Sequence, residues 1–438
     1  MVLTDRAILI IGGGIAGLCA AIAARRLGAI VRVVESAPPA LLGGNARHAR
    51  NFRIAHAEPV WHTPGAYPEH EFLDELMKVG GGSADEVLAR ALVADSAQCA
   101  AWLTGCGVRL QAPGTGVLPY SRRTAFLLGG GQAMVNALHQ TAARIGVGFT
   151  TEAEVVALAP TPDGGWAAEI AQGPARRRVE ARAVVVASGG PGADPDWRRA
   201  HFGPVAEGVL IRGSRYSNGL MMQRLVESGA RTVGDPSSCH MVAVDARGPA
   251  CDGGIVTRIT AIPHGLVVDR ATRPVARAGA GADKSHYAQW GAKIAGCDGG
   301  LAFLILDAEG FARAPPAAFA PLRADTLEDL AGALDLDGAA LKRAVEAFNQ
   351  GHARPIVTPP FAAFPLRAGL TFVHYGLAVD AFLRVTRSNG DPFEGLFAAG
   401  MIMASNILPR GYLAGLGLTL SAVTGRRAGE AAARHALA

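Results

Sequence analysis

The sequence predicts an α/β protein in which one domain is inserted into another. Its 438 residues match two or three domains of ordinary size. Segments typical of buried parallel strands alternate with Ala-rich and Leu-rich helical segments over residues 7–34 and 395–436. Residues 239–360 differ in character, with short strands and an acidic helical piece. We therefore expect residues 1–238 and 361–438 to form one domain around an inserted domain, 239–360.

Apolar runs and the glycines that end them predict the individual elements. Residues 7–11 (AILII) predict a buried strand, residues 15–27 a helix, and residues 30–34 a second strand. The same reasoning predicts helices at 131–145 and 415–436 and strands at 183–187, 370–379 and 395–400. In the inserted domain it predicts short strands at 255–259 and 264–268 and a helical piece over 325–349.

Composition and charge exclude several functional classes. The net charge is +5, but no basic run exceeds Arg176–Arg178, so nucleic-acid binding is not expected. The surplus arginines fit either a solvated surface or a pocket for an anionic substrate, and both stay open. The six cysteines lack metal or iron–sulfur spacing, so no metal is expected. No apolar run is long enough to span a membrane, which favours a cytoplasmic protein.

The strongest local signal is Gly12-x-Gly14-x-x-Gly17, which follows the first strand and opens the first helix. In this pattern the first glycine permits a tight turn, the second lets the backbone approach a pyrophosphate, and the third allows close packing of the helix. Glu35, at the end of the second strand, is placed to accept hydrogen bonds from an adenosine ribose. The motif predicts a Rossmann-like dinucleotide-binding domain without distinguishing FAD from NAD.

Two further glycine-rich segments, at 43–44 and 395–417, favour FAD. Glycine lets the backbone approach a ligand closely. Three separated glycine turns suit a long, extended cofactor whose far end needs contacts of its own. An NAD-binding domain seldom needs the glycine-rich segments at 43–44 and 395–417.

Together these motifs resemble the fumarate reductase/succinate dehydrogenase flavoprotein superfamily. The resemblance covers essentially the whole chain and is carried by the Gly12–Glu35 fingerprint, Gly43–Asn45, Gly129–Gly131, Val184–Gly190 and Gly395–Gly400. Four motifs are most similar to FAD-dependent tricarballylate dehydrogenase and to the flavoprotein part of the cobalamin-pathway precorrin oxygenase CobZ. They are GNARH at 44–48 with Asn51 and Arg53, GDPSSCH at 234–240, DGGIVTR at 252–258 and RGYLAG at 410–415.

The resemblance implies a Rossmann-like FAD-binding domain of the GR2 type with an inserted α+β capping domain. It implies an enzyme acting on CH–CH groups that oxidises a polycarboxylate, as from tricarballylate to cis-aconitate, by hydride transfer to flavin N5 and proton abstraction by a cap-domain base. Two alternatives stay open: a CobZ-like flavoprotein of cobalamin (precorrin) biosynthesis, and a non-catalytic flavin electron-transfer subunit. The expected electron acceptor is a separate membrane-bound iron–sulfur/haem partner, which would keep the chain cytoplasmic or peripheral to the inner membrane.

The resemblance also implies which residues contact FAD. The expected contacts are Gly12, Gly14, Ile15, Ala16, Gly17, Glu35, Ser36, Gly43, Gly44, Asn45, Ala46, Val155, Ala187, Ser188, Gly189, Asn218, Gly400, Met401, Gly415 and Leu416. Ala46 stands where succinate dehydrogenases carry the histidine that attaches flavin, so non-covalent FAD is expected. Met401 stands where the superfamily usually has a glutamate that contacts the ribityl chain, which removes one polar contact.

For the substrate, the resemblance implies cations that hold carboxylates. Arg410 matches a substrate-binding arginine of the superfamily, and a planar guanidinium binds both oxygens of a carboxylate. His240 matches a substrate histidine, with a buried core histidine as the alternative. Thr257 and Arg258 stand where fumarate reductases carry Thr followed by an acid. An arginine there suits a substrate with an extra carboxylate.

Three further residues complete the expected substrate site. His374 either lines the pocket from its strand or is a buried structural histidine, and the sequence does not decide between these. Lys284 is the expected proton-transfer residue, and Arg277 is the reserve candidate. The cap segment around them does not preserve the motif of the fumarate reductases.

Overall fold

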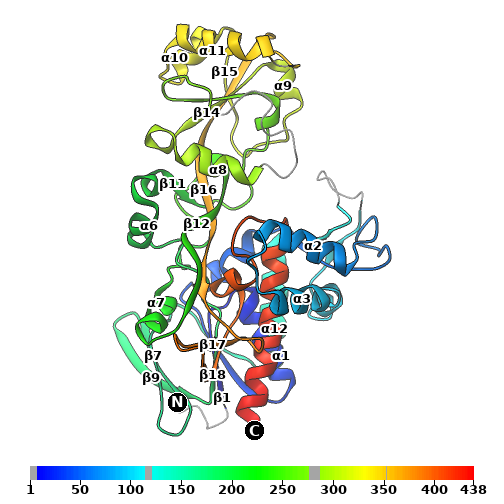
Figure 1. The fold of residues 1–438 in the computed structure, drawn as a ribbon, viewed down its shortest axis with the longest axis vertical. Helices are drawn as coiled ribbons and strands as arrows, with labels where there is room; N and C mark the ends of the chain where they lie inside the picture. The colour runs from blue at the N-terminus through cyan, green and yellow to red at the C-terminus, as the bar shows by residue number, and fades with distance from the viewer. Residues whose placement is uncertain (1–6, 114–120, 276–286, 352) are drawn as a thin grey trace. The chain divides into compact units, whose positions relative to one another are not determined.

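The structure, a computed structural model, describes residues 7–113, 121–275, 287–351 and 353–438 (Figure 1). The chain divides into two compact units. The first comprises Met1–Asp194, Ser214–Cys239 and Phe372–Ala438, and the second comprises Pro195–Gly213 and His240–Thr371. The domain boundaries expected after residues 238 and 360 stay predictions, while the compact units divide the chain after Cys239 and after Thr371.

A six-stranded sheet forms the centre of the first unit, in the order β17-β18-β10-β1-β2-β6. Its strands are β1 (Ala7–Ile11), β2 (Ile30–Val34), β6 (Gly148–Thr150), β10 (Ala183–Val186), β17 (Arg384–Thr386) and β18 (Pro392–Ala398). All neighbouring strands are parallel except β17 and β18. Every residue of β1 and β10 is buried, as expected for strands covered on both faces.

Two helices pack on each other beside this sheet, α1 (Ile15–Arg26) and α12 (Leu416–Leu437), drawn in blue and red in Figure 1. Glycines of α12 make the close approach possible. A Cβ added at Gly425 would lie 2.3 Å from the Ala16 carbonyl oxygen, and one added at Gly429 would lie 2.2 Å from that of Ala20. The first and last helices of the described chain are thereby joined in one core.

The rest of the first unit consists of helices and two small antiparallel sheets. The helices are α2 (Glu69–Gly80), α3 (Glu86–Ser96), α4 (Cys99–Thr104), α5 (Gly130–Arg144) and α7 (Leu220–Glu227). The sheets are β3 (Asn51–Arg53), β5 (Thr124–Leu127) and β4 (Leu110–Gln111), and β7 (Glu154–Pro160), β8 (Trp166–Gln172) and β9 (Ala175–Ala181).

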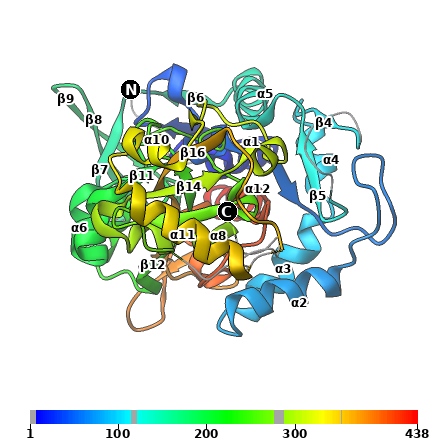
Figure 2. The ribbon, with the colours of Figure 1, turned by 90° about the horizontal axis from the view of Figure 1, so that it is seen from above.

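The second unit contains most of another six-stranded sheet. Its strands are β11 (Val209–Ile211), β16 (Phe361–Leu377), β14 (Ala302–Leu306) and β13 (Leu266–Asp269), with β12 (Thr232–Asp245) and β15 (Leu322–Ala324) also pairing with β16. Its helices are α6 (Pro195–Phe202), α8 (Tyr287–Ala295), α9 (Ala308–Ala312), α10 (Leu327–Ala333) and α11 (Gly338–Gly351). Helices α10 and α11 lie next to each other (Figure 2).

The expected elements of the first unit are confirmed, and most of their ends agree with the structure to within one or two residues. The strand expected at 370–379 begins earlier, since β16 starts at Phe361. The strand expected at 255–259 is wrong. Asp252 and Gly254 adopt left-handed φ angles of 61° and 63°, and the Arg258 N–H donates to the Ile255 carbonyl, so this segment forms turns.

The helical piece expected at 325–349 is two helices, α10 and α11. Between them Asp335 adopts a left-handed φ of 57°, which breaks the helical path. Among the residues that the structure describes, no helix is both long and apolar enough to cross a membrane.

Candidate functional site

The glycine turn between β1 and α1 has the geometry that a dinucleotide needs. A Cβ added at Gly17 would lie 1.9 Å from the Gly12 carbonyl oxygen, so the protein itself requires glycine there. Gly14 is different, because its φ is an ordinary −70° and an added Cβ would meet only the Gly43 carbonyl oxygen, at 3.7 Å. Gly14 also begins α1 without a side-chain cap. The N–H groups of the first turn are therefore available to an anion, as the pyrophosphate of FAD requires.

Glu35 lies directly after β2 and is fixed by backbone hydrogen bonds. Its Oε2 accepts from the Gly13 N–H at 2.6 Å, and its Oε1 accepts from the Ala37 N–H at 2.7 Å. The Ser36 hydroxyl is 3.4 Å from the same Oε1. A carboxylate has about four lone-pair positions, so Glu35 retains capacity for ribose hydroxyls. The residue is 6% exposed and already oriented toward the glycine turn.

The end of β10 lies against the same turn. A Cβ added at Gly12 would be 2.6 Å from the Ala187 carbonyl oxygen, and Gly12 itself has a φ of 104°. The hydroxyl of Ser188 is buried and has no hydrogen-bond partner among the residues that the structure describes. Gly189, which follows, has a φ of 79°. Because a buried polar group without a partner is costly, Ser188 fits a site that a polar ligand completes.

The segment after Leu42 lies across from α1. Gly43 has a φ of 112°, and a Cβ there would be 2.7 Å from the Val135 side chain. Gly44 also has a positive φ, of 55°, with no atom within 4 Å of an added Cβ. The Asn45 Oδ1 accepts from the Ser214 N–H at 2.8 Å, and Ala46 is buried. Arg47 was not among the expected contacts, yet its Nη1 is buried without a partner.

We expect acid precipitation to release all flavin from the protein, because Ala46 supplies no nucleophile at the position where the resemblance described above implies attachment. The measurement is flavin fluorescence of the denatured chain on a gel, with the supernatant assayed for FAD. Fluorescence that stays with the chain would contradict non-covalent binding.

Glycines near the C-terminus complete the predicted cofactor segments. Gly400 has a φ of 76°, its N–H donates to the Thr424 hydroxyl at 2.9 Å, and a Cβ there would be 2.7 Å from that of Ala16. Gly415 begins α12 with a φ of 81° and no side-chain cap. Met401 is half-buried, and Leu416 is fully buried.

The structure gives Val155 and Asn218 other contacts within the first unit. Val155 is buried in β7, where its backbone pairs with Ile170. The Asn218 amide donates to Glu154 at 2.8 Å, and its carbonyl oxygen accepts from the Leu220 N–H at 3.1 Å. Contacts of these two residues with FAD stay predictions.

Of the predicted substrate residues, Arg410 and His374 lie in the first unit. The Arg410 guanidinium lies directly over Gly81, where an added Cβ would be 1.6 Å from Nη2. Arg410 is exposed, and no residue of the described chain forms an ion pair with it. His374 is 2% exposed, and both of its ring nitrogens are hydrogen-bonded: Nδ1 with the Ser238 hydroxyl and Nε2 with the Gly411 carbonyl, each at 2.9 Å. Its ring therefore has no nitrogen left for a substrate.

His240, Thr257 and Arg258 lie in the second unit. His240 is buried near the middle of β12. Thr257 is buried, its hydroxyl donates to the Gly254 carbonyl at 3.3 Å, and its own carbonyl accepts from the Asp245 N–H at 2.8 Å. Arg258 is half-buried and pairs by a backbone bridge with Val244. Arg277 and Lys284 lie outside the described residues.

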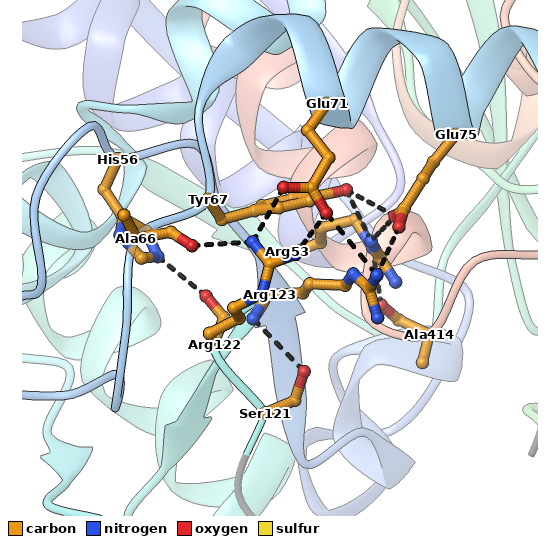
Figure 3. A network of polar contacts seen from close by, with 10 residues as sticks. All are labelled: Arg53, His56, Ala66, Tyr67, Glu71, Glu75, Ser121, Arg122, Arg123 and Ala414. Atoms are coloured by element: carbon orange, nitrogen blue, oxygen red, sulfur yellow. Dashed lines mark hydrogen bonds and ion pairs between the residues drawn. The ribbon is translucent and has the colours of Figure 1, made fainter.

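The sequence did not predict a buried polar network that supports the turn after Arg410 (Figure 3). Arg53 of β3 donates to the Tyr67 hydroxyl at 2.6 Å, to Glu75 of α2 at 2.7 Å and to the Ala414 carbonyl at 3.1 Å. Tyr67 donates to Glu75 at 2.6 Å, and Arg123 pairs with Glu75 at 2.7 Å. Burial raises the pKa of Tyr67, which therefore stays a neutral donor. The network connects β3 and α2 with the segment that leads into α12.

Comparison with known proteins identifies the family. The family described as FAD binding domain matches residues 7–418. The probable fumarate reductase Ifc3 of Shewanella frigidimarina (strain NCIMB 400) is 23% identical over 98% of this chain and 75% of that protein. The open conformation of a flavocytochrome c3 fumarate reductase has a TM-score of 0.80 at 22% identity, covering 98% of this chain and 78% of that one. For 3-ketosteroid delta1-dehydrogenase from Sterolibacterium denitrificans the TM-score is 0.78 at 19% identity, with 98% and 99% covered.

Proposed function

The chain belongs to this FAD-binding family and is an FAD-dependent oxidoreductase, and from that premise we propose that it dehydrogenates a polycarboxylate of the tricarballylate type. The observation that carries the proposal is Arg410. Its guanidinium is exposed, lies on glycine backbone and has no acidic partner in the described chain. A cation held in this way suits a substrate carboxylate, because a guanidinium presents two parallel donors to both oxygens.

In the proposed reaction the chemistry supplied by bound FAD would be that of an acceptor for a hydride from a substrate carbon. The protein contributes binding and proton transfer. Arg410 binds one carboxylate, and His240, Thr257 and Arg258 contact the others. Lys284, or Arg277 in its place, takes the proton from the adjacent carbon, which leaves a carbon–carbon double bond. The electrons then pass to a separate acceptor, for which we propose a membrane-bound iron–sulfur/haem protein that would hold a cytoplasmic chain at the inner membrane.

The test is anaerobic mixing of the FAD-loaded protein with tricarballylate, citrate, succinate and 4-androstene-3,17-dione, followed by flavin absorbance. Tricarballylate is expected to bleach the flavin. Bleaching by the steroid alone would favour the activity named for the Sterolibacterium relative and would overturn the proposal. If none of the compounds bleaches the flavin, the result would favour the alternative function, a non-catalytic flavin electron-transfer subunit.

Arg410→Ala is expected to retain FAD and to lower the bleaching rate at subsaturating tricarballylate by about 10- to 100-fold, since a hydrogen bond to a charged group contributes about 1.5–3 kcal/mol. Arg90→Ala is the matched control, because Arg90 is an exposed arginine of α3 that pairs with Glu86 at the surface. Unchanged bleaching in Arg410→Ala would refute the role of Arg410 in substrate binding.

A further inference from the structure

We propose that His374 is a positioning residue that holds the Arg410–Gly411 turn in place through the Gly411 carbonyl. The proposal rests on the function proposed above for Arg410. It replaces the expected contact of His374 with the substrate by an indirect role, which acts through the backbone of the residue next to the arginine.

The hydrogen bonds of His374 define its tautomer. A carbonyl oxygen only accepts, so the 2.9 Å contact with Gly411 requires the proton on Nε2. Nδ1 of the neutral ring then accepts from the Ser238 hydroxyl, also at 2.9 Å. Burial lowers the pKa of His374 by more than the hydrogen bond to the Gly411 carbonyl and the carboxylate of Asp235 raise it. The ring therefore stays neutral at pH 7, with its one N–H directed at the turn.

The turn is also held by close packing on the C-terminal end of α2. Gly411 has a φ of 67°, and a Cβ there would be 2.6 Å from Cγ2 of Val79. The side chain of Pro409 would be 3.5 Å from a Cβ at Gly80, and the Arg410 guanidinium covers Gly81. The turn thus packs on α2 and is hydrogen-bonded to His374. Fixing the backbone of Arg410 defines where its side chain begins, so that less of this segment has to be ordered on binding.

Phe372 packs against the ring of His374. The two rings meet edge-on at 5.2 Å, and Phe372 in turn contacts Tyr412, at 5.7 Å between centroids. The chain therefore places one apolar ring against the imidazole, whose one N–H is directed at Gly411. A pocket-lining histidine would instead have to expose a ring nitrogen.

Two variants of similar size separate the hydrogen bond from packing. His374→Gln retains an amide N–H that reaches as far as Nε2, whereas His374→Phe fills the space without a donor. The first measurement needs no substrate: amide hydrogen exchange of the peptide spanning 409–415 in the FAD-loaded protein. We expect about fivefold faster exchange in His374→Phe, the effect of losing one hydrogen bond of about 1 kcal/mol, and near wild-type exchange in His374→Gln.

Equal exchange in the Gln and Phe variants would overturn the proposal. If the Phe variant does not yield folded flavoprotein, His374→Asn replaces it, because the shorter amide does not reach Gly411. Faster exchange in the Asn variant than in the Gln variant would then support the proposal, and equal exchange in the two would overturn it.

The second measurement asks whether His374 acts through Arg410. The rate of flavin bleaching is measured against tricarballylate concentration for each variant, and the apparent Kd is read from the saturation of that rate. We expect His374→Phe to raise the Kd about fivefold when Arg410 is present and to have no further effect in an Arg410→Ala background. Equal effects in both backgrounds would overturn positioning through Arg410. If Arg410→Ala alone leaves the Kd unchanged, the function proposed for Arg410 fails, while the exchange data still decide whether His374 holds the turn.

Discussion

Gly14→Ala is expected to weaken FAD binding by about 10- to 100-fold while leaving the apoprotein folded, since inserting a methyl group into a filled site costs about 1–3 kcal/mol. Alanine adopts the φ of −70° at this position without strain, and the nearest atom to its Cβ would be the Gly43 carbonyl oxygen at 3.7 Å. Nothing in the described chain therefore requires glycine at position 14. The requirement comes from the cofactor, whose pyrophosphate approaches the backbone at the start of α1.

Two other glycines serve as controls for this result. Gly332 in α10 has no atom within 4 Å of an added Cβ, so Gly332→Ala should leave the Kd for FAD unchanged and slightly raise stability. Gly17→Ala should instead destabilise the apoprotein, because its Cβ would be 1.9 Å from the Gly12 carbonyl oxygen. Titration of FAD into apoprotein and thermal unfolding of the apoprotein measure the two effects separately. A wild-type Kd in Gly14→Ala would show that the cofactor does not approach this backbone.

The unit formed by β1, the glycine turn, α1 and β2 could be predicted from sequence because its signals are local. A strand, three spaced glycines and an acid at the next strand end lie within residues 7–35, and the structure places them as the pattern predicts. Residues 255–259 show the limit of the same reasoning. Their β-branched composition is typical of a strand, but the left-handed residues at 252 and 254 turn the chain first.

The contacts of His374 show a different limit. Its hydrogen-bond partners are 136 and 37 residues away in sequence, so no local pattern could reveal that both ring nitrogens are occupied. The sequence around His374 is compatible both with a histidine that contacts substrate and with a buried structural histidine. Only the tertiary structure distinguishes an imidazole available to a ligand from one that is used to hold a turn.

The sequence places Arg53 in a motif that begins at Gly44, but its partners Tyr67, Glu75 and Ala414 lie in other segments of the chain. We expect Arg53→Met to lower the free energy of unfolding by about 3 kcal/mol, the lower end of what breaking a buried ion pair costs. The side chain of Arg53 is 6% exposed, and methionine fills similar space without a charge. The Tyr67 hydroxyl and the Ala414 carbonyl would lose a donor, whereas Glu75 keeps Arg123 at 2.7 Å. Retention of that second partner is why we expect the lower value.

Denaturant midpoints of the FAD-loaded protein measure this loss, with Arg90→Met as the matched control. Arg90 pairs with Glu86 in α3 where both side chains are more than half exposed, so its replacement should change stability by less than about 0.5 kcal/mol. Adding Glu75→Gln to Arg53→Met tests the cause. If the loss comes from an acid left with too few donors, the double variant should recover part of the stability, because a neutral amide needs less compensation. A double variant less stable by the sum of both single losses would show that Arg53 acts through packing on Tyr67 and not through its charge.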